Sequence, residues 1–337
     1  MASTRNLKYL WSLLPGILTI AGNYLGSWWA ISNFIFSLMV LAILEQLLPE
    51  DKSNQSESDS GIPDAILCTH FLFQILSLAV LFYSIREGRI SGYFLVFAML
   101  STGVHTGSSS IIVAHEMIHR KSRHWQWAGK FLLLTAGNIY FYVDHLRVHH
   151  KWVGTVNDPA TARKGESLYS FFLRSSIGQV RSSYNLEKER LAKLGLTSFH
   201  YRNYIVASVA ILLAASFLIY EFVGIYGLAV FAGQCLLANF LLEYINYIEH
   251  YGLSRSLTNK VDTTLSWQSD KVISRFMLID LSRHSDHHFL ASKPYHTLHS
   301  HSDSPVLPGG YASCIYLALI PVLWFRIIDP KINTTRK

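Results

Sequence analysis

Long apolar segments alternate with hydrophilic ones along most of the chain. Several of the apolar segments approach or exceed the roughly 20 residues that an α-helix needs to cross a bilayer. Successive apolar segments form pairs, and the link between the two segments of a pair is short. This pattern favours helical hairpins. We therefore predict an all-α, polytopic membrane protein with six transmembrane helices, at about residues 9–24, 29–48, 65–85, 91–114, 204–220 and 224–244.

Two further apolar segments fit this pattern less well. The apolar segment at residues 127–143 is short for a full span and is interrupted by Gly137 and Asn138. We expect it to be re-entrant or buried against other helices. Residues 311–328 contain Pro321, and their sequence is compatible with a re-entrant, interfacial or spanning position.

The hydrophilic segments 115–202 and 245–310 follow the fourth and sixth predicted spans. With the amino terminus in the cytoplasm, both of these spans end on the cytoplasmic side. The two segments then form one cytoplasmic cap rich in histidine. We predict a single domain, residues 1–337, integral to the inner membrane of the cell.

The composition supports a membrane protein. The chain is 50% hydrophobic and 15% charged, whereas soluble domains carry roughly 25% charged residues. The net charge of +7 is spread over separate hydrophilic segments, so it does not indicate nucleic-acid binding. Three cysteines lie in apolar sequence without a C-x-x-C pair, which argues against a disulfide framework or a cysteine zinc site.

The chain contains 16 histidines, and nine of them lie in four clusters. The clusters are A-H-E-M-I-H-R at 114–120, D-H-L-R-V-H-H at 144–150, N-Y-I-E-H-Y-G at 246–252 and R-H-S-D-H-H at 283–288. Spacings of three and four residues place side chains on one helical face. Neutral imidazole binds iron, zinc, copper and nickel.

Nine imidazoles exceed what one tetrahedral zinc ion can use. They favour two metal ions, each with an open position for oxygen. We assign no catalytic residue beyond these ligands. The candidate ligands are His115, His119, His145, His149, His150, His250, His284, His287 and His288.

Carboxylates near these histidines are candidates for orienting them, because a carboxylate can accept the second ring N–H of a ligand histidine. Four of them lie beside a candidate ligand, and two lie on loops near the site. They are Glu116, Asp144, Glu249 and Asp286, and the loop residues Asp158 and Asp303.

Other interpretations exist for parts of this pattern. His-Glu-x-x-His also marks zinc proteases, with the glutamate as general base, but an intramembrane zinc protease leaves most of the histidines unexplained. A transporter is disfavoured because transport sites lie near mid-membrane. Basic residues at 120–123 and 181–193 are typical of a solvated face; the alternative is a docking surface for an acidic electron carrier.

The motifs resemble the membrane-bound alkane 1-monooxygenases, within the histidine-box superfamily of fatty-acid desaturases and hydroxylases. The resemblance covers about residues 100–328. Asp144 stands where the family usually has Glu, and Val148 where Gly is common. The matching segments are the four histidine clusters, N-D-P-A-T-A-R at 157–163 and S-P-V-L-P-G-G-Y-A-S at 304–313.

The resemblance implies two iron ions held by the nine histidines. It implies O2-dependent hydroxylation of the terminal methyl group of an alkane or similar hydrophobic molecule to a primary alcohol. Electrons would come from a rubredoxin or ferredoxin and its NAD(P)H-dependent reductase. The substrate would enter from the lipid bilayer into a channel walled by the first four spans. A fatty-acyl desaturase or hydroxylase of the same superfamily is the alternative.

Overall fold

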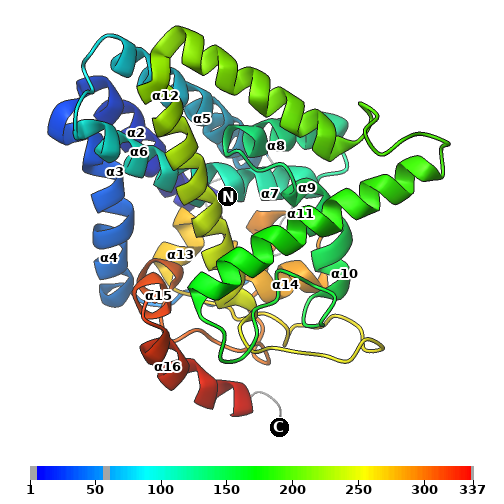
Figure 1. Ribbon diagram of the computed structural model, residues 1–337. Coiled ribbons are helices and arrows are strands. Elements are labelled where there is room, and N and C mark those ends of the chain that lie inside the picture. Colours follow the sequence, from blue (N-terminus) through cyan, green and yellow to red (C-terminus); the bar gives the residue numbers. More distant parts are fainter. Residues whose placement is uncertain (1–5, 56–60, 335–337) are drawn as a thin grey trace.

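The computed structural model describes residues 6–55 and 61–334. Within these ranges the chain is helical, with isolated β-bridges and no β-strand (Figure 1). This confirms the predicted all-α class. The first half contains η1 Asn6–Leu13, α2 Leu14–Leu25, η2 Ser27–Ile31, α3 Ser32–Ile35, η3 Phe36–Val40, α4 Leu41–Leu47, α5 Gly61–Arg86, α6 Phe94–His105, η4 Thr106–Ser110, α7 Ile111–His119, α8 Arg123–Thr135, α9 Phe141–Asp144, η5 His145–His149 and α10 His150–Trp152.

The second half is built around two long helices. Its elements are α11 Leu168–Ala192, α12 Tyr204–His250, α13 Val272–Met277, α14 His284–Phe289, η6 Tyr295–Thr297, α15 Tyr311–Ala318 and α16 Pro321–Thr334.

Four helical segments are long and apolar enough to cross a membrane: Ser27–Leu47, Gly61–Arg86, Phe94–His119 and Tyr204–His250. The pair Tyr311–Ala318 and Pro321–Ile332, bent by 117°, would make a fifth if counted as one span. The structure therefore supports a helical membrane protein with four or five candidate spans. The finer prediction of six spans is not confirmed.

Three of the six predicted spans account for this difference. Residues 9–24 form a 3-10 helix followed by α2, which has 12 residues and is too short to span a membrane by itself. Residues 204–220 and 224–244 form one element, α12, broken at Gly224 with φ 83°. Figure 1 shows the two parts of α12 running in different directions from the break, and together they count as one candidate span.

Helix α8 covers most of the apolar segment at 127–143 and has 13 residues, too few to span. It packs closely on α7: a Cβ at Gly129 would lie 2.7 Å from Ile118 Cγ2 and 2.9 Å from the Ala114 carbonyl oxygen. This matches the expectation that the segment is buried against other helices.

The four histidine clusters lie on α7, on η5 with the start of α10, at the carboxyl end of α12 and on α14. In Figure 1, α7 lies near the centre of the molecule, with α10 to its right and α14 below it. Beneath the histidines, the side chains of Ile111, Ile112, Ile245 and Ile248 belong to one buried apolar core. Two of the clusters thus lie at the ends of long helical segments, and the other two lie on the short elements η5, α10 and α14.

Candidate metal centre

The nine histidines come together in two groups. Within each group the potential ligand atoms all lie within 4.8 Å of one another. The five-histidine group is His115, His119, His145, His150 and His287, and the four-histidine group is His149, His250, His284 and His288. Only His119 and His150 are partly exposed; the other seven are buried.

A π turn, η5, divides the second cluster between the two groups. The backbone N–H of His150 donates to the carbonyl of His145, five residues back. The wider turn brings His145 and His150 to one side, where their Nε2 atoms lie 3.0 Å apart. His149 turns to the other group. The four-residue spacing alone placed His145 and His149 on one face; the π turn changes this, and such turns occur frequently at functional sites.

The last cluster is divided in the same way by a regular helix. His284 and His288, four positions apart on α14, bring their Nε2 atoms within 3.0 Å in the four-histidine group. His287 Nε2 lies 3.1 Å from His150 Nε2 in the other group. Adjacent helical side chains point about 100° apart. A His-His pair such as 287–288 can therefore serve two neighbouring sites.

The geometry fits metal binding. Nε2–Nε2 distances in the five-histidine group are 3.0–3.2 Å. Imidazoles bound at about 2.0–2.1 Å place adjacent ligand atoms about 3.0–3.4 Å apart. In addition, the buried Nε2 atoms of His115, His149 and His250 have no hydrogen-bond partner among the described residues. Buried polar atoms normally have a partner, and a metal ion would provide one.

The protonation state also suits ligation. Burial lowers the pKa of His145, His150, His284, His287 and His288 well below its ordinary value. Desolvation disfavours the charged imidazolium, so these rings are neutral near pH 7. Neutral imidazole is the form that binds a metal ion.

Two hydrogen bonds made by Nδ1 atoms fix rings of the four-histidine group. His149 donates from Nδ1 to Asp158 Oδ2 at 2.8 Å, and Thr161 donates to the same oxygen at 2.6 Å. His250 donates from Nδ1 to the carbonyl of Leu265 at 3.0 Å. These bonds set the tautomers so that each Nε2 faces the group. Burial raises the pKa of Asp158, but His149 and Thr161 outweigh it and the net pKa is lowered.

Glu249 is the second carboxylate at the histidines. Its Oε2 lies 3.2 Å from His284 Nε2. Its Oε1 accepts a hydrogen bond of 2.7 Å from the hydroxyl of Tyr311. Sequence reasoning missed Tyr311, although it lies in the S-P-V-L-P-G-G-Y-A-S segment, and it also missed Thr161 and the Leu265 carbonyl.

The other four predicted carboxylates contact residues other than the nine candidate ligands. Glu116 pairs with Arg120 at 2.7 Å, and Asp144 accepts from Ser182. Asp286 contacts Lys293 and His301 and so anchors the loop after α14. Asp303 is exposed and accepts from Thr263 at 2.6 Å.

A small cavity lies against both histidine groups. His115 and His145 of the five-histidine group line it, and so does His284 of the four-histidine group. The rest of its wall is mainly apolar, with Ile111, Ile112, Phe141, Leu242, Ile245 and Leu281. A reacting group in this cavity would therefore lie beside both histidine groups, against a mainly apolar wall.

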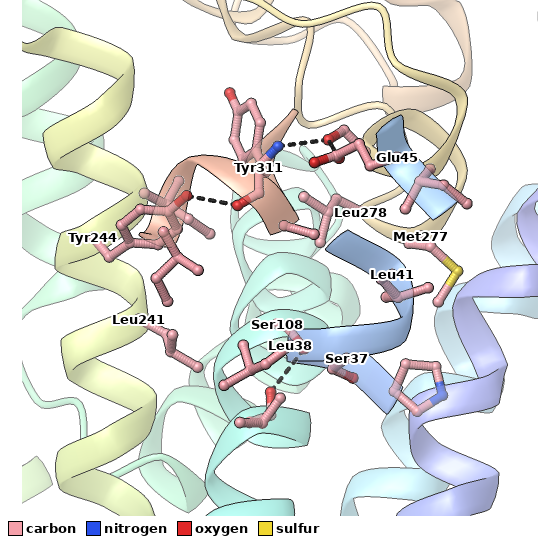
Figure 2. Close-up of a pocket in the computed structure, with 17 residues that line it drawn as sticks. Ser37, Leu38, Leu41, Glu45, Ser108, Leu241, Tyr244, Met277, Leu278 and Tyr311 are labelled. Carbon is pink, nitrogen blue, oxygen red and sulfur yellow. Dashed lines mark hydrogen bonds between the residues drawn. The ribbon is translucent and has the colours of Figure 1, made fainter. Parts of the chain in front are cut away.

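Figure 2 shows a second, apolar cavity, which shares a lining residue with the first. Leu38 and Leu41 line it from the first candidate span, and Leu241 and Tyr244 from α12. Ile245 lines both cavities. Figure 2 shows Tyr244 directed at Tyr311, and its hydroxyl donates to the Tyr311 carbonyl at 2.6 Å.

Comparisons with known proteins agree with this site. The fatty acid desaturase family model matches residues 91–318. Alkane 1-monooxygenase 2 of Pseudomonas aeruginosa is 35% identical, over 97% of this chain and 88% of the relative. Alkane 1-monooxygenase 2 of Alcanivorax borkumensis is 33% identical, over 91% and 83%. The xylene/toluene monooxygenase hydroxylase component of Pseudomonas putida is 28% identical, over 93% and 85%.

These relatives extend over nearly the whole chain, and the resemblance seen in the histidine motifs is confirmed. The chain belongs to the alkane 1-monooxygenase family of membrane monooxygenases, within the wider fatty acid desaturase family.

Proposed function

We propose that the protein hydroxylates the terminal methyl group of an alkane or similar hydrophobic molecule, using O2 and two iron ions. The reaction is RH + O2 + 2 electrons + 2 H⁺ giving ROH + H2O. The grouping of five and four histidines supports two metal ions, since imidazole-rich sites with open positions suit iron oxygenases. When bound, iron supplies the activation of O2, which no side chain provides.

The observation that carries this proposal is the pair of adjoining cavities. The outer, apolar cavity would hold the hydrocarbon chain, and the inner cavity would present the methyl group to His115, His145 and His284. Ile245 lies between them as a shared wall. Apolar walls exclude water from the reacting end of the substrate. The channel expected between the first four spans also uses α12, α13 and α15.

Individual residues have separate roles in this proposal. The nine histidines hold the metal ions, and Asp158 orients His149 through its Nδ1. Glu249, held by Tyr311, places Oε2 3.2 Å from the Nε2 of His284, so its carboxylate lies beside the four-histidine group. The apolar lining residues position the substrate.

The electrons would come from a rubredoxin or ferredoxin and its NAD(P)H-dependent reductase. The protein would lie in the inner membrane with the histidine groups on the cytoplasmic side. The ends of the candidate spans Phe94–His119 and Tyr204–His250 carry histidines of both groups, which supports a site at one membrane surface.

The test combines metal content with product analysis. Mass spectrometry of the detergent-purified protein should find about two irons per chain. Incubation with octane, O2 and a rubredoxin–reductase system should give 1-octanol. A double bond or a mid-chain alcohol would instead indicate a desaturase or another hydroxylase of the superfamily. One zinc ion without iron, after growth with ample iron, would contradict the proposal and favour the protease.

A further inference from the structure

A hollow in the surface of the cap lies beside the four-histidine group. We call it the basic hollow; its wall comes mainly from residues 154–164 and 252–255, with Arg174 from α11 and Ile332 from α16. Four of its lining residues are basic and one is acidic. They are Arg163, Lys164, Arg174 and Arg255, and the acidic residue is Asp158.

The basic hollow is linked to the metal centre through Asp158. Asp158 is buried, with 3% of the residue exposed, and its Oδ2 accepts the N–H of His149 at 2.8 Å. One hydrogen-bonded carboxylate therefore joins the wall of the hollow to an imidazole of the four-histidine group. A redox group held in the hollow would be coupled to the centre by this short path.

Two of the four cations belong to a rigid wall. The guanidinium of Arg255 donates to the carbonyls of Lys151 and Val153, at 2.6 and 2.8 Å. Arg174 donates to the carbonyls of Pro159 and Thr161, both at 3.0 Å, and its charge is paired with Glu166 at 2.7 Å. A preformed wall costs little ordering entropy when a partner binds.

The remaining cations and one apolar side chain face outward. Arg163 and Lys164 are exposed, and Val156 in the same wall is 90% exposed. Basic side chains beside an exposed apolar residue suit a transient complex with an acidic protein, since complementary charge steers the encounter.

We propose that the basic hollow is the docking site of the electron carrier, an acidic one-electron iron–sulfur protein; this rests on the proposed function. Each turnover needs two electrons, so two reduced carriers dock in succession and each leaves oxidised by one electron. The carriers are reduced in turn by the NAD(P)H-dependent reductase. The hollow differs from the basic residues at 120–123 and 181–193, which the sequence offered as a docking surface.

The test is a double charge reversal, Arg163→Glu with Lys164→Glu, in the full chain. The probe is a purified acidic rubredoxin, and the readout is its Kd for the detergent-purified protein in 50 mM salt. We expect the Kd to rise roughly tenfold and its salt dependence to weaken, because complementary charges guide the encounter. Iron content should stay unchanged. Val156→Asp should also raise the Kd.

The control is Lys188→Glu with Lys193→Glu, an equal charge change at the opposite end of α11. That helix has 25 residues and would be about 37 Å long at 1.5 Å per residue. The control should leave the Kd unchanged. A larger effect in the control than in the double variant at 163 and 164 would overturn the inference and favour the alternative surface.

Failure of this inference can be separated from failure of the proposed function. If the unaltered protein makes 1-octanol but the reversal at 163 and 164 leaves the Kd unchanged, only the docking site is wrong. If that reversal instead removes co-purified phospholipid without changing the Kd, the hollow binds lipid headgroups and the inference is overturned. If the unaltered protein holds iron but neither binds the carrier nor forms product, both proposals fail.

Discussion

The Nε2 atoms of His145 and His150 lie 3.0 Å apart although five positions separate the two residues. In a regular α-helix, side chains five positions apart point about 140° away from each other. The π turn at His145–His149 removes this divergence. It joins His150 to the five-histidine group and leaves His149 for the four-histidine group.

This division predicts that single ligand substitutions act on one metal site first. His287→Ala removes a ligand of the five-histidine group, and His250→Ala removes one of the four-histidine group. We expect iron content to fall from about two to about one per chain or lower, and hydroxylation to fall at least about 100-fold. Metal analysis and product yield measure both effects.

His124→Ala is the matched control, because His124 is exposed on α8 and outside both groups. It should keep iron and activity. Normal iron and full activity in His250→Ala or His287→Ala would remove that residue from the ligand set.

The sequence predicted which histidines assemble, but not how they divide. The clusters identified all nine residues of the two groups, because ligand spacing is local. The π turn at His145 and the break at Gly224 depend on packing, and no residue pattern marked them. Proximity in sequence was a poor guide to the carboxylates: Glu116 neighbours His115 yet pairs with Arg120, whereas Asp158, nine residues after His149, binds it.

Asp158→Asn should weaken the four-histidine site without removing a ligand. The change deprives His149 Nδ1 of its carboxylate acceptor at 2.8 Å. Loss of such an acceptor lowers metal affinity or activity about 10- to 100-fold. Metal retention during dialysis against a chelator measures the effect. Asp262→Asn, at an exposed residue that binds Thr264, is the control; equal retention by the two variants would contradict a role for Asp158.

Metal retention should fall in mild acid. The pKa of five of the ligand histidines, among them His145 and His284, is lowered in the native protein. Released from burial, each imidazole takes up a proton near its ordinary pKa of about 6.5. Protons therefore favour the opened, metal-free chain as the pH falls below about 6.5. We expect metal loss at pH 5.5 to be roughly tenfold faster than at pH 7.5. Equal rates at the two pH values would contradict this account.

The adjoining cavities predict two different effects on substrate choice. Ile245→Phe places a larger ring in the wall that both cavities share. It should lower hydroxylation of alkanes of all chain lengths at least about tenfold, because overfilling a packed site costs about 1–3 kcal/mol.

Leu41→Phe narrows only the outer cavity, whose lining includes no metal-group histidine. It should spare short alkanes and lower the yield from long ones. Both variants should keep iron, since neither residue is a candidate ligand. Competition between hexane and dodecane, with the alcohols measured by mass spectrometry, distinguishes the two effects. An unchanged product ratio in Leu41→Phe would show that the outer cavity does not hold the hydrocarbon chain.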